Sequence, residues 1–142
     1  MTWDGARYKF QRLQIYQLGL NYVDKVYRLT HRLPRSETLN LSSQLERAST
    51  SVVLNIAEGS TGQTNAEQAR FLGLALRSLM ESVACLDLVE RHNYASVGEL
   101  APIRELGHQL FMKIQAMRNS LNKVGVQVSV ASPRSLVKRN EQ

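Results

Sequence analysis

Few residues in this 142-residue chain have a type and spacing that could do chemistry, and the first candidate is a single Glu-x-x-His motif, Glu105 with His108. Helical bundles hold two metal ions with two such motifs and two further carboxylates. The chain has no second motif, and its three histidines and one cysteine are too few soft ligands for a zinc site. We therefore expect Glu105 and His108 to lie on a solvated helix face, and we predict no metal and no cofactor.

The lone cysteine, Cys85, is the candidate nucleophile. It follows Ala84 and lacks the basic neighbour that lowers the pKa of a reactive thiol. We expect a small buried hydrophobic residue instead. No Ser/His/Asp or Cys/His set can be assembled, so we predict that the chain is not an enzyme. The alternative is an enzyme that uses Glu58 or Glu81 in a bundle cavity.

Polar residues beside the apolar seam of one helix, with a possible partner on the next, form a third candidate set. Asn55 falls near the seam, Arg47 and Glu58 lie on its flank with Ser51, and Glu81 is the candidate partner of Arg47. Buried polar groups must find hydrogen-bond partners. We predict a structural polar network that sets helix register or a subunit contact. A binding site is the alternative.

Charge is segregated along the sequence. Residues 1–36 hold seven Lys or Arg against two Asp or Glu, residues 37–99 hold four against eight, and residues 100–142 hold seven against two, within a total net charge of +6. If the first and last helices are neighbours, their basic residues share one face and attract phosphates. The alternative is a solvated basic face without a partner. The predicted nucleic-acid-binding residues are Arg28, Arg32, Arg35, Arg104, Arg118 and Lys123.

Apolar residues recur at steps of three and four in four segments, at about 9–33, 41–59, 64–91 and 96–122. We expect each segment to form a helix, the second ending at Gly59 as a C-cap. The seam of the second segment consists of Leu41, Leu45, Ala48, Val52 and Ile56. Capping boxes open the last two segments: Thr64 with Glu67 and Ser96 with Glu99.

The first segment carries two apolar stripes on nearly opposite faces, which exceeds what a bundle helix needs. We expect the first stripe to face the core: Leu13, Tyr16, Leu20, Val23 and Tyr27. We expect self-association to cover the second: Ile15, Leu18, Tyr22, Val26, Leu29 and Leu33. On this interpretation, glutamates at Tyr22 and Val26 break an oligomer while much of the helix remains.

The end of the chain has a different pattern. Valines alternate with other residues from Val124 to Val130, which is strand spacing. A single strand has no partner in a bundle. We therefore expect residues 1–122 to form the bundle and residues 123–142 an extended or partly disordered tail. An arm or strand that pairs with another subunit is the alternative.

Several of these residues also carry a resemblance. They are Gln44-Leu45-Glu46-Arg47-Ala48, Ser51, Asn55-Ile56-Ala57-Glu58-Gly59, Thr64, Glu67, Phe71-Leu72, Ala75, Ser78-Leu79 and Glu81. The pattern resembles the small bacterial four-helix-bundle family that is often encoded in intervening sequences of 23S ribosomal RNA genes. The resemblance implies a ring, a pentamer, without known enzyme activity. The pattern is also similar to that of the accessory proteins of diversity-generating retroelements. Those proteins are basic rings that engage nucleic acid and a reverse transcriptase.

These observations lead to one overall prediction. The chain is all-α, an antiparallel up-down-up-down four-helix bundle in an oligomeric ring. It lacks an apolar run near the roughly 20 residues that cross a bilayer, and we expect it to be soluble and cytoplasmic, without a membrane partner. We predict a non-enzymatic homo-oligomer that binds nucleic acid, RNA in particular, through its basic face. The alternative is a protein-interaction scaffold, such as a reverse-transcriptase accessory-like ring, without direct nucleic-acid binding.

Overall fold

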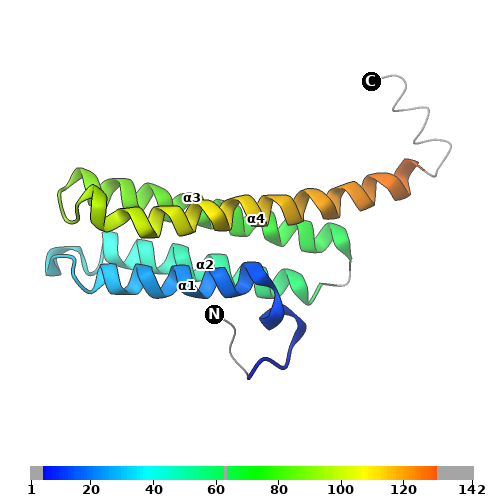
Figure 1. The fold of residues 1–142 in the computed structure, drawn as a ribbon, viewed down its shortest axis with the longest axis horizontal. Helices are drawn as coiled ribbons and strands as arrows, with labels where there is room; N and C mark the ends of the chain where they lie inside the picture. Colours follow the sequence, from blue (N-terminus) through cyan, green and yellow to red (C-terminus); the bar gives the residue numbers. More distant parts are fainter. Residues whose placement is uncertain (1–4, 63, 131–142) are drawn as a thin grey trace, which may run out of the picture.

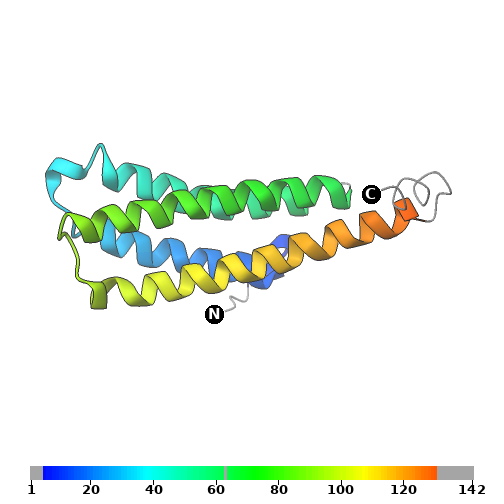
Figure 2. The same ribbon diagram turned by 90° about the horizontal axis from the view of Figure 1, so that it is seen from above.

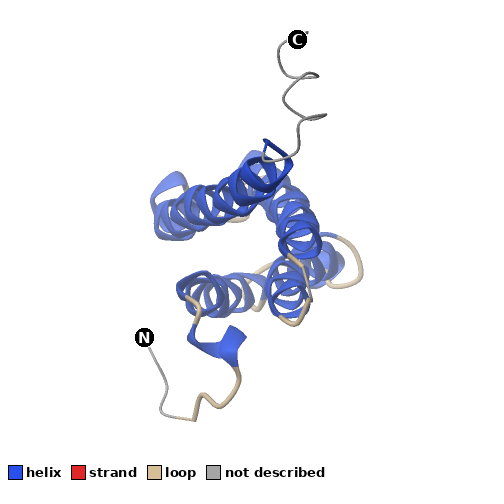
Figure 3. Cartoon of the chain, turned by 90° about the vertical axis from the view of Figure 1, so that its right-hand side faces the viewer, coloured by secondary structure: helices blue, strands red, loops and turns tan. Residues whose placement is uncertain are grey.

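The computed structural model describes residues 5–62 and 64–130, with the backbone alone described for residues 124–130. Four long helices lie side by side (Figure 1), and helices and loops are the sole elements of these residues, as Figure 3 shows along the bundle. The all-α, four-helix prediction is therefore confirmed. The elements are η1 (Lys9–Arg12), α1 (Gln14–Thr30), η2 (Arg35–Glu37), α2 (Leu41–Ser60), α3 (Asn65–Arg91) and α4 (Val97–Val130).

The first helix is shorter than the predicted 9–33. Leu13 is extended, with φ −66° and ψ 133°, and separates the 3-10 turn η1 from α1, which ends at Thr30. The side chain of Gln11 accepts hydrogen bonds from the backbone N–H groups of Arg7 and Tyr8, at 2.8 and 2.9 Å. These two backbone N–H groups therefore have a partner without being part of a continuous helix. The apolar spacing alone does not indicate this break before α1.

The stripe of α1 that was expected to be covered by self-association is the one that faces the core. Tyr22 and Val26 have no exposed surface, and Ile15 and Leu29 are also buried. The stripe that was expected to face the core is half-buried, and its Tyr27 is 39% exposed. Apolar periodicity marks faces of a helix and does not say which face meets the neighbouring helices.

Tyr22 shows what selects the buried stripe. Its hydroxyl lies 2.7 Å from Oγ of Ser82 on α3, and its ring packs against Gly107 of α4, where an added Cβ would lie 3.0 Å from the ring. Tyr22 is therefore part of the hydrophobic core, in contact with both α3 and α4. We therefore expect glutamates at Tyr22 and Val26 to unfold the bundle, rather than to break an oligomer while much of the helix remains.

The predicted seam of α2 is confirmed. Its members are buried: Leu41, Leu45, Ala48, Val52 and Ile56. Gly59, however, is not a left-handed C-cap, since α2 continues to Ser60 and no described glycine has a positive φ. A Cβ at Gly59 would lie 2.7 Å from Cβ of Phe71. The glycine thus allows α2 and α3 to approach closely.

The predicted capping box before α4 has both of its bonds, and the one before α3 shows the bond to the N-cap side chain. The Thr64 side chain accepts a hydrogen bond from the Glu67 N–H at 3.0 Å, before α3. Before α4, the Ser96 N–H donates to Glu99 Oε1 at 3.0 Å, and the Glu99 N–H donates to Ser96 Oγ at 3.1 Å. These bonds satisfy backbone donors that a helix start leaves without partners.

The last helix is longer than predicted. α4 runs to Val130 and extends past the N-terminal end of α3 (Figure 2), so residues 123–130 are helical and the expected extended segment is not found there. Adding residues to an existing helix costs little, because each new residue gains a hydrogen bond. Residues 131–142 of the expected tail lie outside the described part. Within that part, no helix is both long and apolar enough to cross a membrane.

Candidate nucleic-acid interface

Of the four residues of the predicted polar network, Asn55 alone takes part in side-chain hydrogen bonds among the described residues, in a small cluster that links α2 to α3. Nδ2 of Asn55, which is half-buried, donates to the carbonyl and Oγ of Ser51 at 2.9 and 3.1 Å. Oγ of Ser51 is 2.8 Å from Oγ of Ser78 on α3. In the described part of the chain, the side chains of the other predicted members form no hydrogen bond or ion pair and are exposed: Arg47, Glu58 and Glu81.

Two of the predicted basic residues are held by carboxylates. Arg32 forms an ion pair with Glu99 at 2.9 Å. Arg104, on α4, contacts two carboxylates of α3, Asp87 at 2.9 Å and Glu90 at 3.3 Å. A phosphate at either guanidinium would have to compete with these partners. Arg104 therefore faces α3 and does not contribute to a face shared with α1.

Arg118 also contacts α3. Its Nε donates to the Ala69 carbonyl at 3.2 Å, and its guanidinium lies against Gly73, where an added Cβ would be 3.1 Å from Nη2. The predicted face between the first and last helices thus loses two of its six residues to the α3–α4 side. Of the other four, Arg32 is paired with Glu99, and three are exposed: Arg28, Arg35 and Lys123.

The charge is segregated along the length of the bundle. The Ser51–Ser78 and Tyr22–Ser82 contacts mark its middle. We define the basic half as residues 5–20, 51–62, 64–80 and 112–123. The basic half holds eight Lys or Arg and two Asp or Glu. The other half, residues 21–50 and 81–111, holds seven Lys or Arg and eight Asp or Glu. This arrangement creates a positive potential at one end.

Three arginines gather in the basic half. Arg70 and Arg77 of α3 and Arg118 of α4 line a groove of about 630 Å³ between the two helices, which we call the arginine groove. Leu74 and Phe111 contribute apolar walls. Of the ion pairs found among the described residues, none includes these three guanidinium groups. The groove therefore offers positive charge without an internal carboxylate to displace.

Sequence reasoning missed Arg70 and Arg77. They are seven residues apart, two helical turns, and so share one face of α3. That spacing was a readable signal, although the segment 37–99 is acidic as a whole. Their approach to Arg118, from the far end of the sequence, depends on how α3 and α4 pack.

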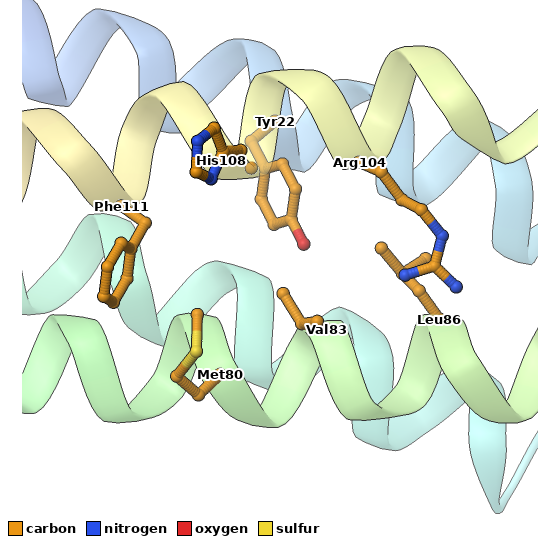
Figure 4. A pocket seen from close by; sticks show the side chains of 8 residues that line it. Tyr22, Met80, Val83, Leu86, Arg104, His108 and Phe111 are labelled. Carbon is orange, nitrogen blue, oxygen red and sulfur yellow. The ribbon is translucent and has the colours of Figure 1, made fainter.

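An apolar cleft of about 310 Å³ adjoins the arginine groove between α3 and α4 (Figure 4). Met80 and Phe111 line both hollows. Tyr22 and Leu86, which have no exposed surface, close its floor. Burial raises the pKa of Tyr22, although its bond to Ser82 opposes the shift. The remaining lining residues include Val83, Arg104 and His108.

The candidate catalytic groups are not brought together. Glu105 and His108 are exposed on α4. Cys85 is buried, as predicted. Burial raises the pKa of its thiol, the negative charge of Glu81 raises this pKa further, and the positive charge of Arg47 lowers it. Among the described residues, no group of three or more His, Cys, Asp or Glu side chains is placed to hold a metal ion.

Comparison with known proteins places this geometry in a family. A crystal structure of a protein of unknown function from the S23 ribosomal protein family of Bacteroides thetaiotaomicron is similar, with a TM-score of 0.69 and 21% identity over 73% of this chain and 97% of that one. No curated protein matches the chain. The family model for 23S rRNA-intervening sequence protein matches residues 11–116. The chain therefore belongs to the 23S rRNA-intervening sequence protein family.

Proposed function

We propose that this chain is a non-enzymatic, cytoplasmic protein that binds nucleic acid through the arginine groove. The observation that carries the proposal is the set of three guanidinium groups, Arg70, Arg77 and Arg118, that line one groove without an ion pair among the described residues. Guanidinium groups match phosphate geometry better than ammonium groups do. We propose the arginine groove as the binding site in place of the face shared by α1 and α4, because Arg104 and Arg118 both contact α3.

RNA is the first ligand to test. The family is named for an intervening sequence of 23S ribosomal RNA, and phosphate contacts from a basic surface do not depend on sequence. Weak, salt-sensitive binding to many strands is therefore the expected behaviour. The basic half, with eight Lys or Arg against two acids, is where association would begin.

Two matched double variants test the proposal. Arg70→Ala with Arg77→Ala removes two charges from the arginine groove, and Arg28→Ala with Arg35→Ala removes two exposed charges from the other half. Fluorescence anisotropy with a labelled single-stranded RNA, over a salt series, is the measurement. The groove variant should bind more weakly, and the slope of log affinity against log salt should flatten by about 1.4, at about 0.7 per phosphate.

The control variant should keep most of the affinity and slope. Equal losses in both variants would mean that net charge, and not the groove, determines binding. If the wild-type protein binds no RNA at low salt, the nucleic-acid function is wrong and the scaffold function takes its place. A scaffold is the second candidate because several large apolar side chains are exposed: Tyr27, Leu54, Leu88 and Met112.

Self-association is part of the same proposal. We infer that the chain is an up-down-up-down bundle that assembles into a homo-oligomeric ring, a pentamer as the family resemblance implies. Leu54 on α2 is 59% exposed and is a suitable position to test. Leu54→Glu should reduce the sedimentation coefficient without loss of helix, whereas Ser43→Glu, also exposed on α2, should leave it unchanged. A wild-type monomer at micromolar concentration would overturn the ring.

A further inference from the structure

We propose that the apolar cleft beside the arginine groove is a subsite for one unstacked base of a single-stranded nucleic acid, whose phosphates lie on the three arginines. This inference rests on the proposed function and narrows its ligand from nucleic acid in general to single strands. It assigns a role to the cleft that the charge pattern alone does not suggest.

The first argument is continuity. Met80 and Phe111 line both the cleft and the arginine groove. Phe111 and Arg118 are seven residues apart on α4, which corresponds to about 10 Å. This is the axial length of about three stacked nucleotides. A strand that follows α3 and α4 can therefore place phosphates on the arginines and a base in the cleft at the same time.

The second argument is the chemistry of the cleft walls. Val83, Met80 and Phe111 provide apolar contact, and Figure 4 shows their side chains directed into the space between α3 and α4. A volume of about 310 Å³ is at the small end of the range for ligand sites and suits a single ring system. Bases of single strands stack on aromatic side chains in this way. His108 and Arg104 at the cleft offer polar groups to the base edge.

The third argument is the direction of the charge. Arg104 is paired with Asp87 and Glu90, so its guanidinium at the far end of the cleft is already neutralised. Phosphates are attracted instead by Arg70 and Arg77 at the other end. A ligand with an apolar ring and an anionic backbone is therefore bound in one orientation, with its ring toward Arg104. A duplex keeps its bases stacked and paired and cannot place one in the cleft.

The experiment compares four ligands with the full chain by anisotropy or competition: a short single-stranded RNA, a fully abasic strand with the same number of phosphates, a duplex, and a nucleoside monophosphate. The base-bearing strand should bind about five- to a hundred-fold more tightly than the abasic strand. The duplex should bind more weakly than the single strand. A monophosphate that binds as tightly as the strand would overturn the proposal, because the free nucleotide would then be the ligand.

Two variants locate the effect. Phe111→Leu retains an apolar side chain but removes the ring, so the ratio of base-bearing to abasic affinity should fall toward one while the salt slope is kept. Met112→Leu changes the neighbouring exposed residue, which does not line the cleft, and should leave the ratio unchanged. Thermal unfolding of both variants shows that each is folded.

The failures of the two proposals differ. If no strand binds at low salt, the nucleic-acid function itself is wrong. If base-bearing and abasic strands bind equally, with salt dependence retained, the nucleic-acid function stands and the base subsite is wrong. If Phe111→Leu leaves the ratio unchanged in a folded protein, the base lies elsewhere and the assignment of the cleft is overturned.

Discussion

The hydroxyl of Tyr22 donates a hydrogen bond to Oγ of Ser82 in the centre of the bundle, where neither residue has exposed surface. The direction follows from the second bond of Ser82, whose single hydroxyl proton is donated to the Leu79 carbonyl at 2.6 Å. This pair joins α1 to α3 at the middle of the bundle. It fixes Tyr22, a member of the buried stripe of α1, against α3.

The two halves of this bond should have unequal effects on stability. Ser82→Ala leaves the Tyr22 hydroxyl buried without an acceptor, which should lower the free energy of unfolding by about 1–3 kcal/mol. Tyr22→Phe leaves Ser82 bonded to Leu79 and should cost about 1 kcal/mol. Urea denaturation of both variants checks the order. A Tyr22→Phe variant less stable than Ser82→Ala would contradict the assigned donor.

The orientation of α1 can be tested with charge. Val26→Glu places a carboxylate at a position without exposed surface and should abolish the cooperative helical signal in far-UV circular dichroism. Tyr27→Glu, at a position that is 39% exposed, should keep the helical signal. The opposite result would restore the stripe assignment expected from the sequence.

Two glycines should respond oppositely to alanine. At Gly59, Cβ would lie 2.7 Å from Cβ of Phe71, so α2 and α3 must move apart and Gly59→Ala should destabilise by about 1–3 kcal/mol. Gly98 is exposed in the first turn of α4, and its nearest neighbour would be 3.9 Å away. Gly98→Ala should stabilise by up to about 1 kcal/mol. Melting temperatures that shift in the same direction would contradict the close approach at Gly59.

Gly73 should affect binding more than stability. A Cβ there would lie 3.1–3.3 Å from the guanidinium of Arg118, the mobile end of a long side chain. Gly73→Ala should therefore displace Arg118 at little cost in stability and weaken RNA binding by the loss of about one phosphate contact, a slope change of about 0.7. Gly98→Ala is the control and should bind as the wild type does. An unchanged salt slope for Gly73→Ala would remove Arg118 from the site.

Acid should weaken the start of α4. Hydrogen bonds from Ser96 and from Arg32 hold the pKa of Glu99 below its ordinary value of 4.5. A carboxyl with a lowered folded pKa stabilises the fold above its unfolded pKa, and this contribution is lost as pH falls through the folded value. Between pH 5 and pH 3, the free energy of unfolding should therefore fall less in Glu99→Gln than in the wild type. The difference is the contribution of the Glu99 carboxyl, which the variant lacks. Identical slopes would contradict the ion pair and capping bonds.

The local structure of this protein was determined by its sequence to a large extent. The capping pairs before α3 and α4 depend on residues three positions apart, and the buried positions of α2 follow from a 3.6-residue repeat. Cys85 was identifiable as a buried residue for the same reason, since its neighbours in sequence are apolar. These features depend on short-range contacts along one helix.

The tertiary structure decided which faces and which distant residues meet. Apolar spacing is symmetric between the two stripes of α1, and the choice depends on Ser82 and Gly107 from other helices. The site required the same information. Arg70 and Arg77 share a face by spacing alone, but Arg118 joins them because α3 and α4 pack so that Arg118 reaches the Ala69 carbonyl. Charge summed along the sequence did not predict this, because potential depends on distances in space.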